Sequence, residues 1–215
     1  MSNIKYPAYL EDAFVTGYKQ TDEDGDVFEF YNQPVGDLNI HDGKIIACDA
    51  FTFYGDDPFT DNFPKGKFPV ELAIAKISAN EDERTGFARI KFSNEAPVKW
   101  EFALIEGQDR SEVENGTMFG YGVDSGTGSF MDLSGHEAYT AAYDEDEKYY
   151  EKVVEQLDEN FEDTRSWLLW QKKNQNVAIF STGWGDGIYQ SYVGFDTNGN
   201  ICRLVTDFGL LDWPE

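Results

Sequence analysis

The sequence predicts an α+β protein built mainly from antiparallel β-sheet in a sandwich-like arrangement, with one long acidic amphipathic helix and a short second helix. Apolar and polar residues alternate through the middle of the chain, a pattern typical of half-buried strands. After residue 137, apolar residues instead recur at three- and four-residue spacing, which indicates a helix. With 40% hydrophobic and 16% aromatic residues, the chain can bury a core. We expect a single domain over residues 1–215, since no repeat or linker-like stretch interrupts it.

The strands are expected to form antiparallel sheet with one polar and one apolar face. Val98, Trp100 and Phe102, for example, alternate with Lys99 and Glu101. The Asn-Gly pair between the last two strands is a strong hairpin signal. Strands are expected at residues 27–31, 44–48, 68–74, 88–92, 98–104, 118–123, 177–181, 188–195 and 201–206.

One long helix is expected from Glu137 to about Phe161. Ser134 and Glu137 match a capping box, in which each side chain accepts a hydrogen bond from the other residue's amide. Residues 167–170 are interpreted as a short second helix, so that residues 137–172 form a helical insertion between β regions. The acidic side of the long helix is either an ordinary solvated face or a docking surface for a partner. The candidate surface residues are Asp144, Glu147, Glu151, Glu155 and Asp158.

The formal net charge of −24 is concentrated in two segments. Residues 1–62, which include an acidic N-terminal segment at 1–40, carry 13 acidic and three basic residues. Residues 137–163 carry 11 acidic and two basic residues, and the rest of the chain is close to balanced. This charge argues against direct binding of nucleic acid or of an anionic membrane, because both are polyanions. It favours a basic protein partner or bound cations.

The chain is expected to be cytoplasmic. No stretch approaches the roughly 18 apolar residues that span a bilayer, and the first ten residues do not form a signal peptide. Cys48 and Cys202 lie far apart in the sequence and form no Cys-x-x-Cys pair, so we expect two buried free thiols.

Two glycine-rich segments centred on aspartates are the best candidates for a site. They cover residues 119–132 and 181–189. Glycine allows positive φ and close backbone approach, as a pocket-forming loop requires. The alternative is that each segment is a tight turn between strands. The candidate ligand-binding residues are Asp124, Ser125, Gly126, Ser181, Trp184, Asp186 and Tyr189.

A divalent cation is the possible cofactor. If the two segments converge, four carboxylates could supply the oxygen ligands that Mg²⁺ or Ca²⁺ prefers. These are Asp124, Asp132, Asp186 and Asp207. Support for nucleophilic catalysis is weak, because His41 and His136 are the only histidines and no Gly-x-Ser-x-Gly elbow is present. We therefore expect a protein that binds a partner rather than an enzyme.

The two segments also resemble a known family. Residues 120–128 read GYGVDSGTG, residues 181–189 read STGWGDGIY, and Pro64–Val70 and the closing Asp207-Phe208 complete the pattern. Over roughly residues 45–210 the chain resembles the bacterial family catalogued as domain of unknown function 4241. The resemblance implies a small standalone bacterial protein and no particular reaction. It gives added weight to Asp124, Asp132, Asp186, Tyr189 and Asp207.

Three functions are consistent with these features. The first is a non-catalytic immunity or inhibitor protein that masks a basic partner such as a nuclease toxin, steered by the two acidic segments. The second is a metal-assisted hydrolase that uses the four aspartates to activate water. The third is a small-molecule sensor in which the glycine-rich loops form the floor of a pocket.

Overall fold

The computed structural model describes residues 5–114, 117, 119–146 and 148–213 and has an α+β fold dominated by antiparallel strands. The helices are α1 (Tyr9–Asp12), α2 (Arg110–Glu114), α3 (Leu133–Glu145) and α4 (Tyr149–Asp158). The first strands are β1 (Lys19–Thr21), β2 (Val27–Ile40), β3 (Ile45–Asp49), β4 (Gly66–Ile77), β5 (Glu83–Lys91) and β6 (Lys99–Phe102). The remaining strands are β7 (Tyr121–Val123), β8 (Thr127–Asp132), β9 (Trp167–Lys172), β10 (Gln175–Ser181), β11 (Gly187–Phe195) and β12 (Ile201–Asp207).

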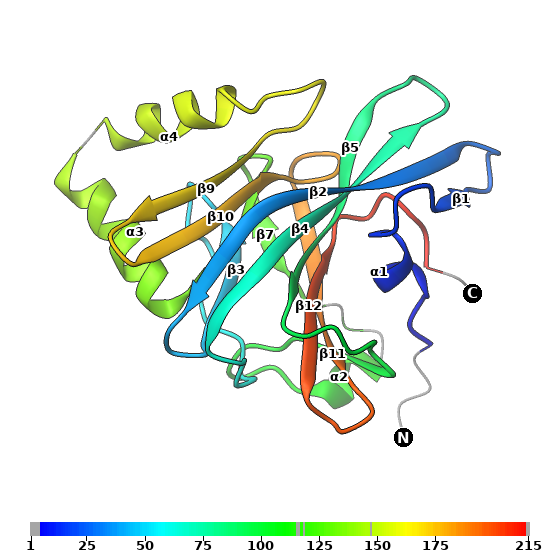
Figure 1. Ribbon diagram of the computed structural model, residues 1–215, viewed down its shortest axis with the longest axis horizontal. Coiled ribbons are helices and arrows are strands. Elements are labelled where there is room, and N and C mark those ends of the chain that lie inside the picture. The colour runs from blue at the N-terminus through cyan, green and yellow to red at the C-terminus, as the bar shows by residue number, and fades with distance from the viewer. Residues whose placement is uncertain (1–4, 115–116, 118, 147, 214–215) are drawn as a thin grey trace.

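The strands form two sheets (Figure 1). The large sheet has the order β1-β2-β4-β5-β12-β11-β6, and β7 also pairs with β11. The small sheet has the order β3-β8-β10-β9. One buried apolar cluster contains residues of both sheets, such as Leu72 of β4, Phe130 of β8 and Val193 of β11. The two sheets therefore share a core.

The outer face of each sheet carries a second apolar cluster and its own cover. On the large sheet, Phe87 and Val205 pack with Leu10 of α1 and with Leu211 near the end of the chain. We call α1 together with residues 210–213 the terminal cover. On the small sheet, α3 and α4 pack over Trp170 and its neighbours (Figure 1). None of the described helices is long and apolar enough to cross a bilayer.

The predicted long helix is in fact two helices, α3 and α4. The backbone of Asp146 is extended, with φ −148° and ψ 108°, so α3 ends there. The side-chain carboxylate of Asp146 accepts a hydrogen bond from the amide of Lys148, and the backbone carbonyl of Asp146 accepts one from the amide of Tyr149. Helix α4 then begins at Tyr149, with Lys148 at its N-cap position and no side-chain cap hydrogen bond. The predicted capping box is also wrong: α3 begins at Leu133, and the Ser134 hydroxyl donates to Asp132.

Residues 167–170 form part of strand β9, not the predicted second helix. Leu168 and Trp170 pack in the cluster beneath α3 and α4, whereas Trp167 and Leu169 pack in the core shared by the sheets. This period-two arrangement covers both faces of the strand, so the sequence shows an apolar run without clear alternation. The helical part of the insertion therefore ends with α4.

Most other strand predictions are confirmed, although β1 and β8 were not predicted. The hairpin between β11 and β12 is confirmed as well. Asp196 and Asn200 pair through a backbone hydrogen bond, and Gly199 has φ +78°. The part of the predicted strand at Met118 lies outside the described residues.

Candidate functional site

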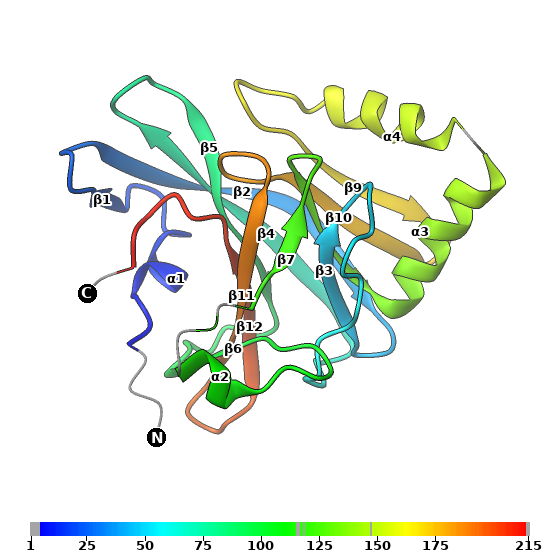
Figure 2. The same cartoon turned by 180° about the vertical axis from the view of Figure 1, so that it is seen from behind.

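Each glycine-rich segment contains a loop that crosses from one sheet to the other. Residues 124–126 join β7 of the large sheet to β8 of the small sheet, and residues 182–186 join β10 to β11. These crossing loops lie side by side (Figure 2). The Gly126 amide donates to Asp186 Oδ1 at 3.0 Å, and the Thr182 amide donates to the Gly126 carbonyl at 3.0 Å. The two segments therefore converge, as the sequence suggested they could.

Asp49, at the end of β3, holds the first crossing loop in place. Its fully buried carboxylate accepts hydrogen bonds from the amides of Asp124 and Ser125, each at 2.8 Å, and from the Ser125 hydroxyl at 2.9 Å. The amides of Phe51 and Thr52 donate to it as well. Burial alone would raise the pKa of Asp49, but these donors together bring it below its ordinary value.

Glycine is required at two points of this junction for different reasons. Gly126 has φ +64°, a left-handed backbone conformation that residues other than glycine adopt only at an energetic cost. At Gly120 the constraint is space, because a Cβ atom would lie 2.6 Å from the carbonyl oxygen of Tyr189. The absence of a side chain at Gly120 allows the chain to approach β11 closely where β7 begins.

The other predicted ligand-binding residues have mixed environments. Asp124, Ser125, Trp184 and Asp186 are exposed at the loop tips. Two further residues are already engaged: Ser181 Oγ accepts from the Ser166 amide, and the buried Tyr189 donates to the Gly185 carbonyl. The Trp184 ring also stacks against Arg84, whose guanidinium carbon lies 5.2 Å from the ring centroid.

The four aspartates predicted to hold a cation do not gather into one site. Asp132 lies at the other end of β8 from the crossing loops, about 17 Å away at 3.4 Å per residue. Its buried carboxylate accepts hydrogen bonds from the amides of His41 and Asp42. Within the part of the chain that the structure describes, no three His, Cys, Asp or Glu side chains could hold a metal ion together.

Asp207 lies on the opposite face of the large sheet, beneath the terminal cover. Its side chain is 3% exposed, and the Gly209 amide donates to it at 2.9 Å. Burial raises the pKa of Asp207 to about 7, while the Gly209 amide and the Trp213 side chain limit that rise. Asp207 therefore belongs to a different region from the crossing loops.

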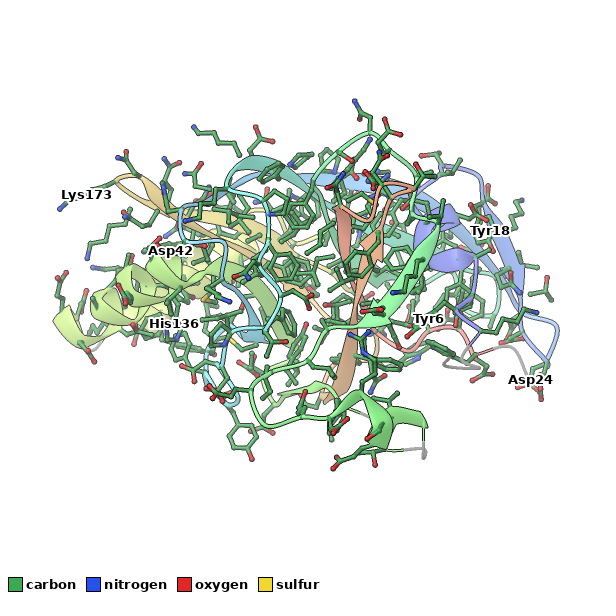
Figure 3. All side chains as sticks on the ribbon, turned by 90° about the horizontal axis from the view of Figure 1, so that it is seen from below. Tyr6, Tyr18, Asp24, Asp42, His136 and Lys173 are labelled. Carbon is green, nitrogen blue, oxygen red and sulfur yellow. The ribbon has the colours of Figure 1, made fainter. Side chains whose placement is uncertain are left out.

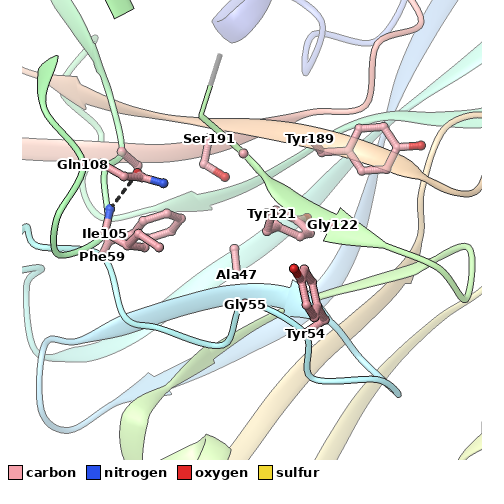
Figure 4. Close-up of a pocket in the computed structure, with 12 residues that line it drawn as sticks. Ala47, Tyr54, Gly55, Phe59, Ile105, Gln108, Tyr121, Gly122, Tyr189 and Ser191 are labelled. Atoms are coloured by element: carbon pink, nitrogen blue, oxygen red, sulfur yellow. Dashed lines mark hydrogen bonds between the residues drawn. The ribbon is translucent and has the colours of Figure 1, made fainter. Parts of the chain in front are cut away.

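A pocket of about 340 Å³ opens where β3 of the small sheet faces β7 and β11 of the large sheet (Figure 4). The strand parts of both glycine-rich segments contribute to its wall, but the aspartates of the loop tips do not. Sequence reasoning identified only Tyr189 among the predicted binding residues that line it. The lining residues are Ala47, Tyr54, Gly55, Phe59, Ala103, Ile105, Gln108, Gly120, Tyr121, Gly122, Tyr189 and Ser191.

The predicted acidic surface lies on α3 and α4. Glu151, Glu155 and Asp158 are exposed on α4, while Val153 and Leu157 of the same helix are buried against the small sheet. The described contacts include no ion pair for these three acids. Asp144 of α3 is exposed too, whereas Glu147 lies outside the described residues.

Comparison with known proteins gives a family and no named relative. No curated protein and no solved structure gives a significant match to the chain. The model of the family described as "Protein of unknown function (DUF4241)" matches residues 38–206, which include both crossing loops and most strands of both sheets. This confirms the resemblance that the glycine-rich segments indicated. Because the match covers well over half of the 215 residues, the chain belongs to the DUF4241 family.

Proposed function

We propose that this protein is a non-catalytic binding protein of the immunity or inhibitor type, which uses the acidic face of α4 to bind a basic protein. The observation that carries the proposal is the stripe formed by Glu151, Glu155 and Asp158. Their spacing of four and three residues places them on one side of the helix. The buried Val153 and Leu157 fix the opposite side against the small sheet, so the stripe faces solvent.

The charges of this stripe are available to a partner. Two nearby lysines are engaged elsewhere: Lys152 pairs with Asp146 and Lys172 pairs with Glu145, both outside the stripe. Like charges four residues apart destabilise a helix by about 0.2–0.5 kcal/mol. A cationic partner would relieve this repulsion and would be steered to the surface by the negative field.

Partly exposed aromatic side chains lie at the two ends of α4 and support a protein partner over small cations. Tyr150, at the start of α4, is 51% exposed although its ring packs edge-on against Phe51 at 4.9 Å, and Phe161, just beyond the end of the helix, is 59% exposed. Aromatic residues are enriched at the centre of protein interfaces, where they contribute much of the binding energy. Charge would then set the association rate and aromatic contact the lifetime of the complex.

The test is affinity capture from the native host with three forms of the protein. The α4 variant carries Glu151→Gln, Glu155→Gln and Asp158→Asn. Its control removes the same charge elsewhere, through Glu23→Gln, Asp24→Asn and Glu106→Gln, all exposed positions. Asp24 of the control lies far from the helical end of the molecule. It and Lys173, which follows β9 beside α3, lie near opposite ends of the long axis (Figure 3).

The wild-type and control proteins are expected to retain one basic protein that the α4 variant loses, with binding that weakens as salt rises. The affinities of the three forms for that purified protein are then measured, with polylysine as a non-specific polycation. If wild type captures no basic protein at low or moderate salt, the proposal is wrong. Equal loss in both variants would also contradict it, because net charge alone would then explain binding.

The metal-assisted hydrolase receives no support from the arrangement of the carboxylates described above. The pocket, by contrast, supports a separate proposal about a ligand.

A further inference from the structure

We propose that the pocket beside β7 binds a small, uncharged aromatic or heterocyclic molecule that carries a hydrogen-bond acceptor such as a carbonyl. This site is independent of the acidic face of α4. The proposal depends on four properties of the pocket: its size, the absence of charge among its described lining residues, its aromatic walls and the position of one amide group.

The size of the pocket results from small residues at positions where larger ones would fill the core. Ala47 of β3 and Ala103, just after β6, are 3% and 6% exposed, and Gly120 and Gly122 provide the opposite wall. The resulting volume of about 340 Å³ is at the lower end of the range for ligand sites. It suits a single ring system better than a nucleotide or a peptide.

Among the residues that the structure describes, the lining contains no Asp, Glu, Lys, Arg or His side chain. A charged ligand would lose hydration on entry and gain no opposite charge in return. The protein's net charge of −24 would repel an anion further. An uncharged ligand avoids both costs.

Aromatic side chains form much of the wall. The rings of Phe59, Tyr121 and Tyr189 are buried, whereas Tyr54 is 77% exposed at the mouth. Tyr54 stands beside Gly122, where a Cβ atom would lie 3.5 Å from its ring. A flat ligand could therefore contact aromatic faces on several sides, and Tyr54 would lose exposure on binding.

Gln108 supplies an oriented hydrogen-bond donor. Its side-chain oxygen accepts from the Ile105 amide at 3.1 Å, which fixes the amide group. Its nitrogen is on the side of Ser191 (Figure 4). The Ser191 hydroxyl is already paired with the Thr206 hydroxyl at 2.8 Å. The Gln108 nitrogen is thus the group best placed to select a ligand with an acceptor.

The test uses benzamide and benzoate, two probes of similar shape that differ in charge. Each is titrated into the full chain, and the methyl resonances of Ala47 and Ala103 are followed by NMR. Benzamide is expected to shift both resonances and to saturate with a millimolar or lower Kd. Benzoate is expected to bind at least tenfold more weakly. Absence of benzamide binding, or equal binding of benzoate, would overturn the proposal.

Two variants place the probe in this pocket. Ala103→Leu fills the space and should abolish the benzamide shift at Ala47, while the same change at exposed Ala141 of α3 should leave it unaltered. Gln108→Glu keeps an oxygen for the Ile105 amide but removes the donor, and should weaken benzamide at least tenfold. Its control is Gln156→Glu on the exposed side of α4. If Ala103→Leu does not fold, the test rests on Gln108→Glu. Unchanged binding of benzamide to Gln108→Glu would refute the proposed site.

Discussion

Asp49, beside the crossing loops, and Asp207, beneath the terminal cover, are both almost fully buried, yet their pKa values move in opposite directions. Asp49 accepts hydrogen bonds from four backbone amides and one hydroxyl. Asp207 has the Gly209 amide and the Trp213 side chain as donors and otherwise lies against the apolar cluster of α1 and the chain end. Burial disfavours the charge of both carboxyl groups, and the number of donors decides whether that penalty is overcome.

The comparison shows what each aspartate contributes. The charged Asp49 organises a loop through backbone contacts 75 and 76 residues away in the sequence. The carboxyl group of Asp207 lies between a sheet and its cover, so its ionisation opposes packing there. The first is expected to stabilise the fold at neutral pH, and the second to weaken it.

The largest expected effect comes from Asp49→Asn. The variant keeps the size of the side chain but replaces one acceptor oxygen by a donor that faces other donors. Each buried amide left without a partner costs about 1–3 kcal/mol, so we expect the free energy of unfolding to fall by about 4 kcal/mol at pH 7. Urea denaturation measures the difference.

The matched control for this change is Asp196→Asn in the β11–β12 turn. Asp196 also accepts backbone amide hydrogen bonds, but from Asn198 and Asn200 of its own turn. Its replacement should destabilise the protein less than Asp49→Asn. Equal losses would mean that the link between distant segments has no special importance.

The contribution of Asp49 to stability should also depend on pH. Because the folded-state pKa of Asp49 is lowered, this contribution should be present above the unfolded-state pKa and should disappear as pH falls through the folded-state pKa.

The role of Asp49 was not predicted from the sequence. It follows the apolar residues 45–48, and a lone acid at the end of a buried strand was the signal that could have identified it. Its partners in the first crossing loop cannot be found from spacing, because they depend on how the two sheets meet. The glycine-rich segments were recognisable from composition, since left-handed φ and close approach restrict residue choice locally.

The errors in secondary structure have the same origin. Strand β9 is covered on both faces, so its apolar residues 167–170 lack the alternation that revealed the half-exposed strands. The pocket was missed because it is made by small residues from five separate segments, which no single motif records. Patterns within one element were predictable, whereas contacts between elements were not.

The second prediction tests whether charge in the terminal cover is tolerated when arginines accompany it. Glu11 of α1 forms ion pairs with Arg203 at 2.8 Å and Arg89 at 3.2 Å, and both arginine side chains are at most 8% exposed. Glu11→Gln should lower the free energy of unfolding by about 3 kcal/mol, because it leaves buried cations with too few partners.

Glu29→Gln is the control for Glu11→Gln. Glu29 pairs with Lys19, and both side chains are at least half exposed. This change should cost less than about 1 kcal/mol. Similar losses in the two variants, measured by urea denaturation, would show that the Glu11 contacts do not anchor the cover.

The third prediction is that the effect of Asp207→Asn on the free energy of unfolding depends on pH. The folded-state pKa of about 7 exceeds the ordinary value of 3.8, so the folded protein binds the proton more tightly than the unfolded chain. The stability contribution of Asp207 therefore falls as pH rises from about 4 to about 7. This rise in pKa sets an upper bound of about 4 kcal/mol, and relaxation around the buried group reduces the expected penalty to about 2 kcal/mol.

Asp207→Asn should therefore gain about 2 kcal/mol relative to wild type when urea denaturation at pH 8 is compared with that at pH 4.5. The variant keeps an oxygen for the Gly209 amide. If variant and wild type differ by the same free energy of unfolding at both pH values, the pKa of Asp207 is not raised in the folded protein. The contrast with Asp49 would then be wrong.

The smallest expected effect separates backbone conformation from the hydrogen bonds of Asp49 in the crossing loops. Gly126→Ala places a side chain at φ +64°, which costs about 1 kcal/mol, although its Cβ would meet Gly185 only at an ordinary 3.7 Å. Gly122→Ala, four residues earlier, has no such backbone constraint and ordinary contact at 3.5 Å, so its stability should not fall. Equal stabilities would show that Gly126 can relax out of its left-handed conformation. A loss confined to Gly126→Ala, independent of pH between 5 and 8, would show that the loop needs this glycine in addition to the buried charge.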